Sequence, residues 1–342
     1  MSWLILLAAT IGCAQAAPLL IFPTENRAVI EGRPGDFFMY VDRNFEGKTS
    51  KPWEGGQYGF VRGPRRVAGE VLYGTLHEGI DIRPVRRNAS GEPLDPILAA
   101  ADGVVVHAST QAGASNYGRY VVVEHIWDGS PYYTLYAHLS DVAVKPGDKV
   151  RQGDTLGRMG YTGDGINKER AHLHFEVCLM LSDTFEEWYS RHIPNTPNKH
   201  GRFNGMNLVG VEPSRLLLEA ARDPGLQISD YIRAGEPFFK VAIPQTSRNF
   251  VLRAYPWLRG KTASAPGWEI TLSRYGVPLA ALPLDDAPSV PVVTWARETD
   301  YAYDHLTRGL LTGPPGKARL TDSGKRFVEL ILGQPAVGPP PD

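Results

Sequence analysis

The stretch "LHEGIDIRP" (residues 76–84) decides the fold, because its composition settles whether this part of the chain is helix or strand. Gly79 costs a helix about 1 kcal/mol relative to Ala, and Ile80 and Ile82 are β-branched residues that favour strands. Pro84 pushes the residue before it toward extended geometry. The stretch is therefore predicted to be extended, within a β-sheet.

The extended geometry determines what the polar residues of this stretch can do. A helical H-E-x-x-H pattern binds zinc with its two histidines and uses the glutamate as a base, but here Asp81 stands in place of the second histidine. In a strand, residues of equal parity share a face, so His77 and Asp81 are expected to point the same way and Glu78 to the opposite side. This excludes Glu78 as the base and leaves two of the three protein ligands of a catalytic zinc site.

A second stretch, "AHLHFEV" (171–177), offers a third ligand. His172, His174 and Glu176 alternate with apolar residues, which predicts a half-buried strand with both histidines on one face. His138, in "YAHLS", lies in another predicted strand. The H-x-H pattern alone leaves a metal site and a scaffold role equally open, and Glu176 could orient a ligand or simply end a strand.

The segments between these motifs predict an antiparallel sheet. The runs at 103–109, 120–127 and 132–140 are rich in β-branched and aromatic residues and are bounded by turn formers. Gly-Asp pairs at 147–148 and 153–154 predict two tight turns. Biotinyl and lipoyl carrier domains have a similar sequence pattern and carry a modified lysine at the tip of a hairpin. No lysine occupies that position here, so this sequence is not predicted to be such a domain. Lone histidines in these runs, His107 and His125, are predicted to be scaffold residues.

Taken in order, the motifs between residues 69 and 176 resemble the lysostaphin/LytM-type zinc endopeptidases, which cut peptide bonds in bacterial peptidoglycan. The fold class this implies is mainly β, an antiparallel β-sheet LytM-type catalytic domain with a C-terminal α+β region. By resemblance the zinc ligands are His77, Asp81 and His174, and the catalytic residues are His138 and His172. Asn116 and Tyr117 would line the cleft, with an ordinary turn as the equal alternative.

The resemblance implies one Zn²⁺ per chain and hydrolysis of peptidoglycan cross-links or stem peptides. A His-His-carboxylate set leaves an open position for water, whose pKa zinc lowers to about 7. Two alternatives are a non-hydrolytic regulator of another cell-wall hydrolase and a zinc peptidase acting on secreted proteins. The five filled positions argue against the regulator.

Charge and the N-terminal segment bear on partners and location. The 342 residues contain 36 basic and 37 acidic side chains, so a net charge of -1 gives no electrostatic reason to expect nucleic acid or an anionic membrane as partner. Residues 1–17 are predicted to be a signal peptide, which implies export to the periplasm or cell envelope. Lipid attachment at Cys13 is the alternative. Cys178 is predicted to be a buried apolar residue.

Composition predicts four segments: a signal peptide (1–17), an N-terminal β-rich extension (18–65), a LytM-type peptidase domain (66–222) with a long insertion at 181–213, and a C-terminal α+β region of unknown role (223–342). Helices are expected near 185–191, at 213–222 and in the stretch between the N-cap Thr321 and the stop Gly333. The insertion could wall the cleft or pack against the sheet.

Overall fold

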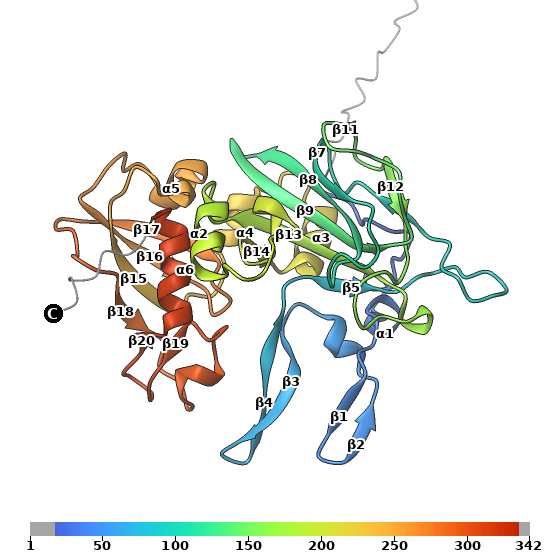
Figure 1. Cartoon of the computed structure of the whole chain (residues 1–342), viewed down its shortest axis with the longest axis horizontal. Helices are drawn as coiled ribbons and strands as arrows, with labels where there is room; N and C mark the ends of the chain where they lie inside the picture. Colours follow the sequence, from blue (N-terminus) through green and yellow to red (C-terminus); the bar gives the residue numbers. More distant parts are fainter. Residues whose placement is uncertain (1–17, 335–342) are drawn as a thin grey trace, which may run out of the picture.

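The computed structural model describes residues 18–334 and consists mainly of antiparallel sheets, which confirms the predicted fold class (Figure 1). The seven-stranded sheet, here called the central sheet, and the C-terminal sheet stand at opposite ends of the molecule, and two hairpins project from one side. The predicted signal peptide, with Cys13, lies outside the described residues. Within residues 18–334, no helix has both the length and the apolar character needed to cross a membrane.

The central sheet has seven strands, in the order β11-β7-β8-β9-β13-β14, with β5 paired to β13 beyond the end of β14. All its pairs are antiparallel. Its strands are β5 (Ile80–Ile82), β7 (Gly103–Ser109), β8 (Arg119–Trp127), β9 (Ser130–Leu139), β11 (Lys149–Val150), β13 (Leu173–Met180) and β14 (Leu208–Val211). An Asp-Gly turn joins β8 to β9, with φ of 51° at Asp128 and 71° at Gly129, as a type I′ hairpin requires.

A smaller three-stranded sheet lies beside it, in the order β10-β12-β6. Its strands are β6 (Pro96–Leu98), β10 (Asp141–Val142) and β12 (Thr155–Arg158). The two predicted Gly-Asp turns are confirmed: φ is 94° at Gly147 and 90° at Gly153, values that glycine adopts without strain. The Asp148 and Asp154 carboxylates accept backbone N–H groups three residues earlier and so fix both turns.

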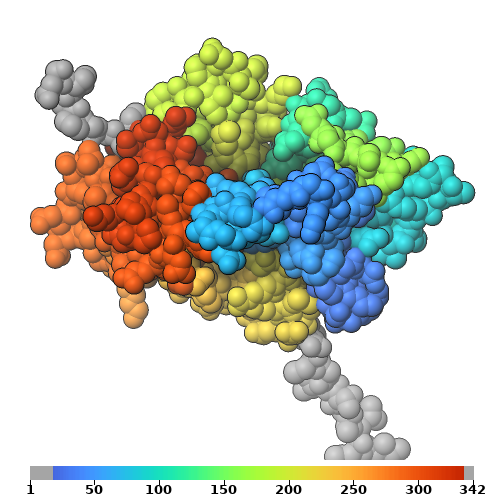
Figure 2. Space-filling model, turned by 90° about the horizontal axis from the view of Figure 1, so that it is seen from below, coloured from blue at the N-terminus to red at the C-terminus, as the bar shows by residue number. Residues whose placement is uncertain are grey.

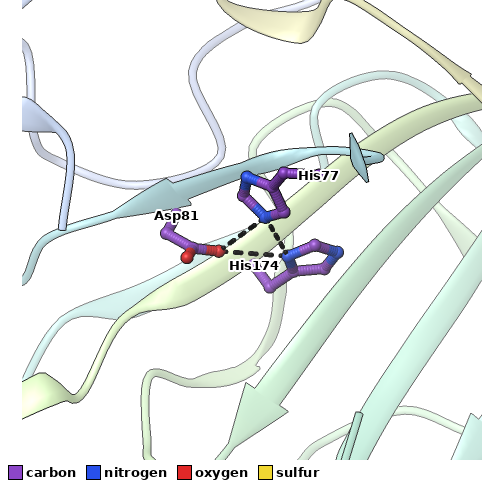
Figure 3. Close-up of side chains that lie close together, drawn as sticks. All are labelled: His77, Asp81 and His174. Atoms are coloured by element: carbon purple, nitrogen blue, oxygen red, sulfur yellow. Dashed lines mark hydrogen bonds and ion pairs between the residues drawn. The ribbon is translucent and has the colours of Figure 1, made fainter. Parts of the chain in front are cut away.

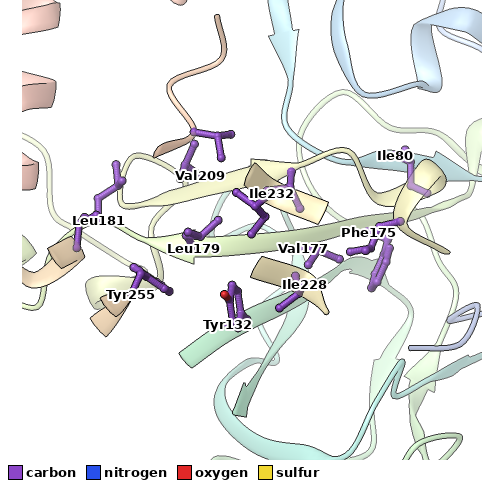
Figure 4. Packing of buried hydrophobic residues seen from close by; sticks show 14 of the residues in the cluster. Ile80, Tyr132, Phe175, Val177, Leu179, Leu181, Val209, Ile228, Ile232 and Tyr255 are labelled. Atoms are coloured by element: carbon purple, nitrogen blue, oxygen red, sulfur yellow. The ribbon is translucent and has the colours of Figure 1, made fainter. Parts of the chain in front are cut away.

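Strand β13 is buried along its whole length and separates two environments. Phe175, Val177 and Leu179 face the main core, where they pack with residues of α3 (Pro213–Arg222) and α4 (Ile228–Arg233) (Figure 4). The alternate residues, beginning with His174 and Glu176, belong to the opposite face. The period-2 pattern of the sequence thus places His174 and Glu176 at the candidate site, while Cys178 and Met180 on the same face join a second apolar cluster. The strand is therefore buried on both faces and not half-buried as predicted.

The N-terminal extension and the residues that directly follow it, up to His77, form two hairpins that lie next to each other (Figure 1). The elements of this segment are α1 (Pro34–Phe37), β1 (Arg43–Phe45), β2 (Lys48–Ser50), η1 (Trp53–Gly56), β3 (Gly59–Val67) and β4 (Glu70–His77). Arg43 Nη1 donates to Tyr73 Oη at 2.9 Å and links the first hairpin to the second. The predicted boundary between residues 65 and 66 falls within β3, and the domain division as a whole stays a prediction.

The C-terminal region is α+β, with a four-stranded antiparallel sheet in the order β17-β16-β15-β18. Its elements are β15 (Phe239–Pro244), α5 (Phe250–Ala254), η4 (Pro256–Arg259), β16 (Gly267–Leu272), β17 (Pro278–Leu284), β18 (Val292–Ala296), η5 (Tyr303–His305), β19 (Leu311–Thr312), β20 (Arg319–Leu320) and α6 (Asp322–Leu332). The predicted start and end of the last helix are confirmed. Thr321 Oγ1 accepts a hydrogen bond from the Gly324 N–H at the N-cap, and Gly333 ends the helix with a left-handed φ of 68°.

The C-terminal region packs against the hairpin β3–β4, as Figure 2 shows from below. The Tyr275 ring lies 5.0 Å from that of Tyr58 and 5.4 Å from that of Phe60, measured between centroids. The Arg274 guanidinium lies 4.8 Å from the centroid of the Phe60 ring. These aromatic and cation–π contacts hold the base of the hairpin in place.

The insertion at 181–213 contains the predicted helix, α2 (Phe185–His192), a short η3 (Gly201–Phe203) and strand β14, by which it joins the central sheet. Trp188 Nε1 donates to the Arg326 carbonyl at 2.9 Å, and His192 Nε2 lies 2.8 Å from Glu329 Oε2. The insertion therefore packs against α6, and none of its residues is among those lining the candidate site described below.

Gly79, between β4 and β5, leaves no room for a side chain. A Cβ atom there would lie 2.4 Å from the Phe175 carbonyl oxygen and 2.8 Å from Glu176 Cγ. We expect Gly79→Ala to displace β5 from β13 and to lower the free energy of unfolding by about 1–3 kcal/mol in denaturant titrations. Gly113→Ala, whose Cβ would meet no atom within 4 Å, is the control. Equal stability of the two variants would contradict this packing.

Candidate metal centre

Three buried side chains from three strands meet at one point (Figure 3). His77 ends β4, Asp81 lies in β5, and His174 lies in β13 directly opposite Asp81 in the antiparallel register. His77 Nε2 is 3.0 Å from His174 Nδ1, and Asp81 Oδ1 is 3.1 Å from each of these nitrogens. The structure thus brings together the three predicted metal ligands, which are 97 residues apart at most.

The donor set fits zinc. Neutral imidazole nitrogens and one carboxylate oxygen are common ligands of catalytic zinc, which holds them at about 2.0–2.1 Å. Ligand atoms of a tetrahedral zinc site therefore lie roughly 3.3–3.4 Å apart. The observed separations of 3.0–3.1 Å differ from this by a few tenths of an ångström, which small rotations of the side chains would supply.

Each of the three side chains is held by a further contact on the side away from the centre. His77 Nδ1 lies 2.8 Å from the Gln57 carbonyl oxygen, and His174 Nε2 lies 2.8 Å from Glu176 Oε1. Acceptors at these positions keep the proton there and leave the opposite nitrogen of each ring free to bind a metal. Arg62 Nη2 donates to Asp81 Oδ2 at 2.6 Å and orients that carboxylate.

Glu176 orients His174, one of the two roles its position suggested. The Tyr117 hydroxyl donates to Glu176 Oε1 at 2.9 Å, and the Cys178 thiol lies 3.2 Å from Oε2. Cys178 is buried, as predicted.

The electrostatics of this point favour a positive charge. Burial disfavours the Asp81 carboxylate, but His172, His77 and Arg62 outweigh it and hold the pKa of Asp81 well below its usual value. Burial would also lower the pKa of His174, yet its contacts with the Asp81 and Glu176 carboxylates raise that pKa to about 10. Two carboxylates around one imidazole thus attract a cation to this spot.

His138 and His172 form a second pair beside the three. Their ring centroids are 4.8 Å apart, and His172 Nε2 lies 3.4 Å from Asp81 Oδ1. His138 Nδ1 lies 2.9 Å from the Thr162 carbonyl oxygen, and His172 Nδ1 lies 2.5 Å from that of Arg170. Both Nδ1 atoms therefore carry protons toward carbonyls. Burial, and next the neighbouring histidines, lower the pKa of His138 well below 6.5.

The backbone of His138 has a strained conformation. Its φ is 64°, a left-handed value that is uncommon for a residue other than glycine and costs of order 1–3 kcal/mol. The His138 N–H donates to the Tyr117 carbonyl at 2.9 Å, and Gly160 packs so closely that a Cβ there would lie 2.8 Å from the His138 carbonyl oxygen. Neighbouring backbone thus fixes the end of β9 in this conformation.

All five predicted site residues line one polar cleft of about 220 Å³. Asn116 and Tyr117 also line it, as the resemblance suggested. Sequence reasoning missed Arg62, Asp164 and Arg170, and nothing in the spacing of these residues signals a site. The lining residues are Arg62, His77, Glu78, Asp81, Asn116, Tyr117, His138, Asp164, Gly165, Ile166, Arg170, His172 and His174.

Glu78 departs from the parity argument. Glu78 was expected on the opposite side of the strand from His77 and Asp81, but it borders the same cleft as they do. The reason is a break in the strand: β4 ends at His77 and β5 begins at Ile80, so strict alternation does not hold between them. Glu78 Oε1 lies 4.0 Å from Arg308 Nη2, and the residue is not part of the three-ligand group.

His107 and His125 lie outside the cleft. Both nitrogens of His125 have partners, the Asp102 carbonyl at 2.7 Å and Thr134 Oγ1 at 2.8 Å, in agreement with a scaffold role. The His107 ring lies tilted against that of Tyr120, with ring centroids 4.8 Å apart.

Comparison with known proteins agrees with this combination of sheet and site. Residues 75–183 match the model of peptidase family M23, so the chain contains a domain of this family. The lipoprotein NlpD/LppB homolog of Pseudomonas aeruginosa is 35% identical over 104 residues, which are 30% of this chain and 30% of the relative. The peptidoglycan DD-endopeptidase ShyC of Vibrio cholerae is 41% identical over 120 residues, 34% of this chain and 23% of the relative.

Among solved structures, the catalytic domain of lysostaphin from Staphylococcus simulans matches with 26% identity and a TM-score of 0.25, over 40% of this chain and 79% of that chain. The chain spans less than a third of the length of the two curated relatives described above.

Glu176 offers a test of how His174 is held. We expect Glu176→Gln to weaken zinc binding by about 10–100-fold, because the amide removes the negative charge that accepts the His174 Nε2 proton. Competition with a chromogenic chelator measures this affinity. Glu124→Gln is the matched control, because Glu124 lies in the same sheet and its Oε1 atom accepts a hydrogen bond from the Tyr133 hydroxyl at 2.8 Å. Unchanged affinity in Glu176→Gln would show that this contact does not support the site.

Proposed function

We propose that this protein is a zinc endopeptidase that hydrolyses peptide bonds in peptidoglycan cross-links or stem peptides. The observation that carries the proposal is the convergence of five histidine and aspartate side chains on one cleft of the M23 domain. The names of the Vibrio cholerae relatives, peptidoglycan DD-endopeptidases, support the substrate. The predicted signal peptide and the lipoprotein relative support export to the cell envelope.

In this proposal His77, Asp81 and His174 bind the zinc ion, and His138 and His172 act on the substrate. Zinc, when bound, supplies a water of lowered pKa and polarises the scissile carbonyl. Because both Nδ1 atoms point to carbonyls, the Nε2 atom of each ring is the one left to exchange a proton with the substrate. One or both histidines then return the proton to the leaving amine and, when charged, stabilise the developing oxyanion.

A regulator that activates another hydrolase is the second candidate. The murein hydrolase activator NlpD of Escherichia coli is 32% identical over 101 residues, 30% of this chain and 22% of that relative. A regulator has no need of a complete catalytic set, and here each predicted position is filled and faces the cleft. Hydrolysis is therefore the better-supported function.

Digestion of two substrates side by side tests the proposal. Purified sacculi and a denatured, unstructured protein are incubated with the zinc-loaded chain, and released peptides are separated by mass spectrometry. We expect new amino termini from sacculi and none from the protein. Cleavage of both would favour a general secreted peptidase, and cleavage of neither, with zinc bound, would favour the regulator.

The two histidines outside the ligand set should separate catalysis from metal binding. We expect His138→Ala and His172→Ala each to lower turnover by about 10²–10⁴-fold, because each removes a proton-transfer group. Both variants should keep about one zinc per chain by elemental analysis. Loss of zinc in either would refute its assignment as a non-ligand.

Glu78→Ala completes this set, because Glu78 borders the cleft without belonging to the ligand group. We expect it to retain turnover within about threefold of wild type in the same peptide-release assay, since truncations away from reacting groups have small effects. An inactive Glu78→Ala protein with zinc bound would identify Glu78 as a base.

A further inference from the structure

We propose that Arg170 binds a free carboxylate of the substrate beside the scissile amide, and so makes the cleft selective for acidic peptides. This inference rests on the proposed function, because it assigns a specificity to the same cleft. Arg170 ends the short helix η2 (Lys168–Arg170) and lines the cleft together with His172.

The Arg170 guanidinium has more donors than partners. Its side chain is only 16% exposed, and its Nε atom is buried with no hydrogen-bond partner among the described residues. Nη1 lies 3.4 Å from the Gly165 carbonyl oxygen and 3.9 Å from a carboxylate oxygen of Asp42, which is itself half exposed. A guanidinium carries five N–H donors, and a largely buried cation with weak partners is unfavourable. An anion that entered the cleft would give the guanidinium further partners.

The other charges around the cleft are committed or repel an anion. Arg62 donates to Asp81 Oδ2 at 2.6 Å and to the Gly55 carbonyl at 2.9 Å. Two sides of its guanidinium are therefore already hydrogen-bonded within the protein. Asp164 and Glu78 are acidic, and Glu78 is paired with Arg308. Among the described cleft residues, Arg170 is thus the cation with the most unused donors.

The position of Arg170 relative to the catalytic pair selects where the carboxylate lies. The Arg170 carbonyl accepts the Nδ1 proton of His172, so the same residue orients a catalytic ring and presents a guanidinium two residues away. A planar guanidinium matches a carboxylate with two parallel hydrogen bonds. A carboxylate held there would fix the neighbouring amide against His172 and the metal centre.

The test uses two synthetic branched peptides that differ in one group, a carboxyl next to the scissile amide that is either free or amidated. We expect wild type to prefer the free acid by at least about tenfold in kcat/KM, the size of one charge-assisted hydrogen bond. Arg170→Gln should lose this preference, because its KM for the free acid rises far more than its KM for the amidated peptide. Arg170→Lys should restore part of it. Lys168→Gln, which removes an exposed charge from the same turn, should retain the full preference.

A merely structural role for Arg170 would lower activity on both peptides equally, and that result would overturn the inference. Calorimetric binding of non-cleavable versions of both peptides separates this inference from the proposed function. Equal cleavage and equal binding of both by wild type would refute the carboxylate site and leave the endopeptidase intact. Preferential, Arg170-dependent binding of the acid without any cleavage would refute the endopeptidase and support the carboxylate site.

Discussion

The pairing of β5 with β13 is the constraint on which the rest of the site depends. It sets Asp81 directly opposite His174 and, through the short Glu78–Gly79 link, places His77 over both. The pairing is specified twice, by the buried contacts of Ile80 and Ile82 with the core and by the close approach of Gly79 to the β13 backbone. A one-residue slip would turn every one of these side chains to the wrong face.

Residues outside the segment that matches family M23, residues 75–183, also hold the candidate metal centre in place. Gln57 and Arg62 precede residue 75 yet contact His77 and Asp81 directly. Both belong to the segment around the hairpin β3–β4, whose base packs on Tyr275 of the C-terminal region. The C-terminal region, for which the sequence suggests no role, thus supports the chain that orients two of the three candidate ligands.

Sequence predicts this site well where the signal is local. Alternation in "AHLHFEV" gives the face of His174 and Glu176, and glycine with β-branched residues gives the extended form of "HEGID". It fails where geometry arises from distant backbone. The left-handed φ of His138 depends on Gly160 and Tyr117, the approach of Arg62 depends on a hairpin, and the strand break at Gly79 moves Glu78 to the edge of the cleft. None of these contacts has a fixed sequence spacing.

The most direct test of the central claim is zinc content measured together with peptide release from purified sacculi, for wild type and His174→Ala. His174 is buried at the meeting point of both carboxylates, so its loss removes one ligand and opens the site. The account predicts about one zinc per wild-type chain with peptides released, and neither zinc nor release in the variant. A wild-type protein that binds no zinc after reconstitution, or a variant that still binds zinc and releases peptides, would contradict it.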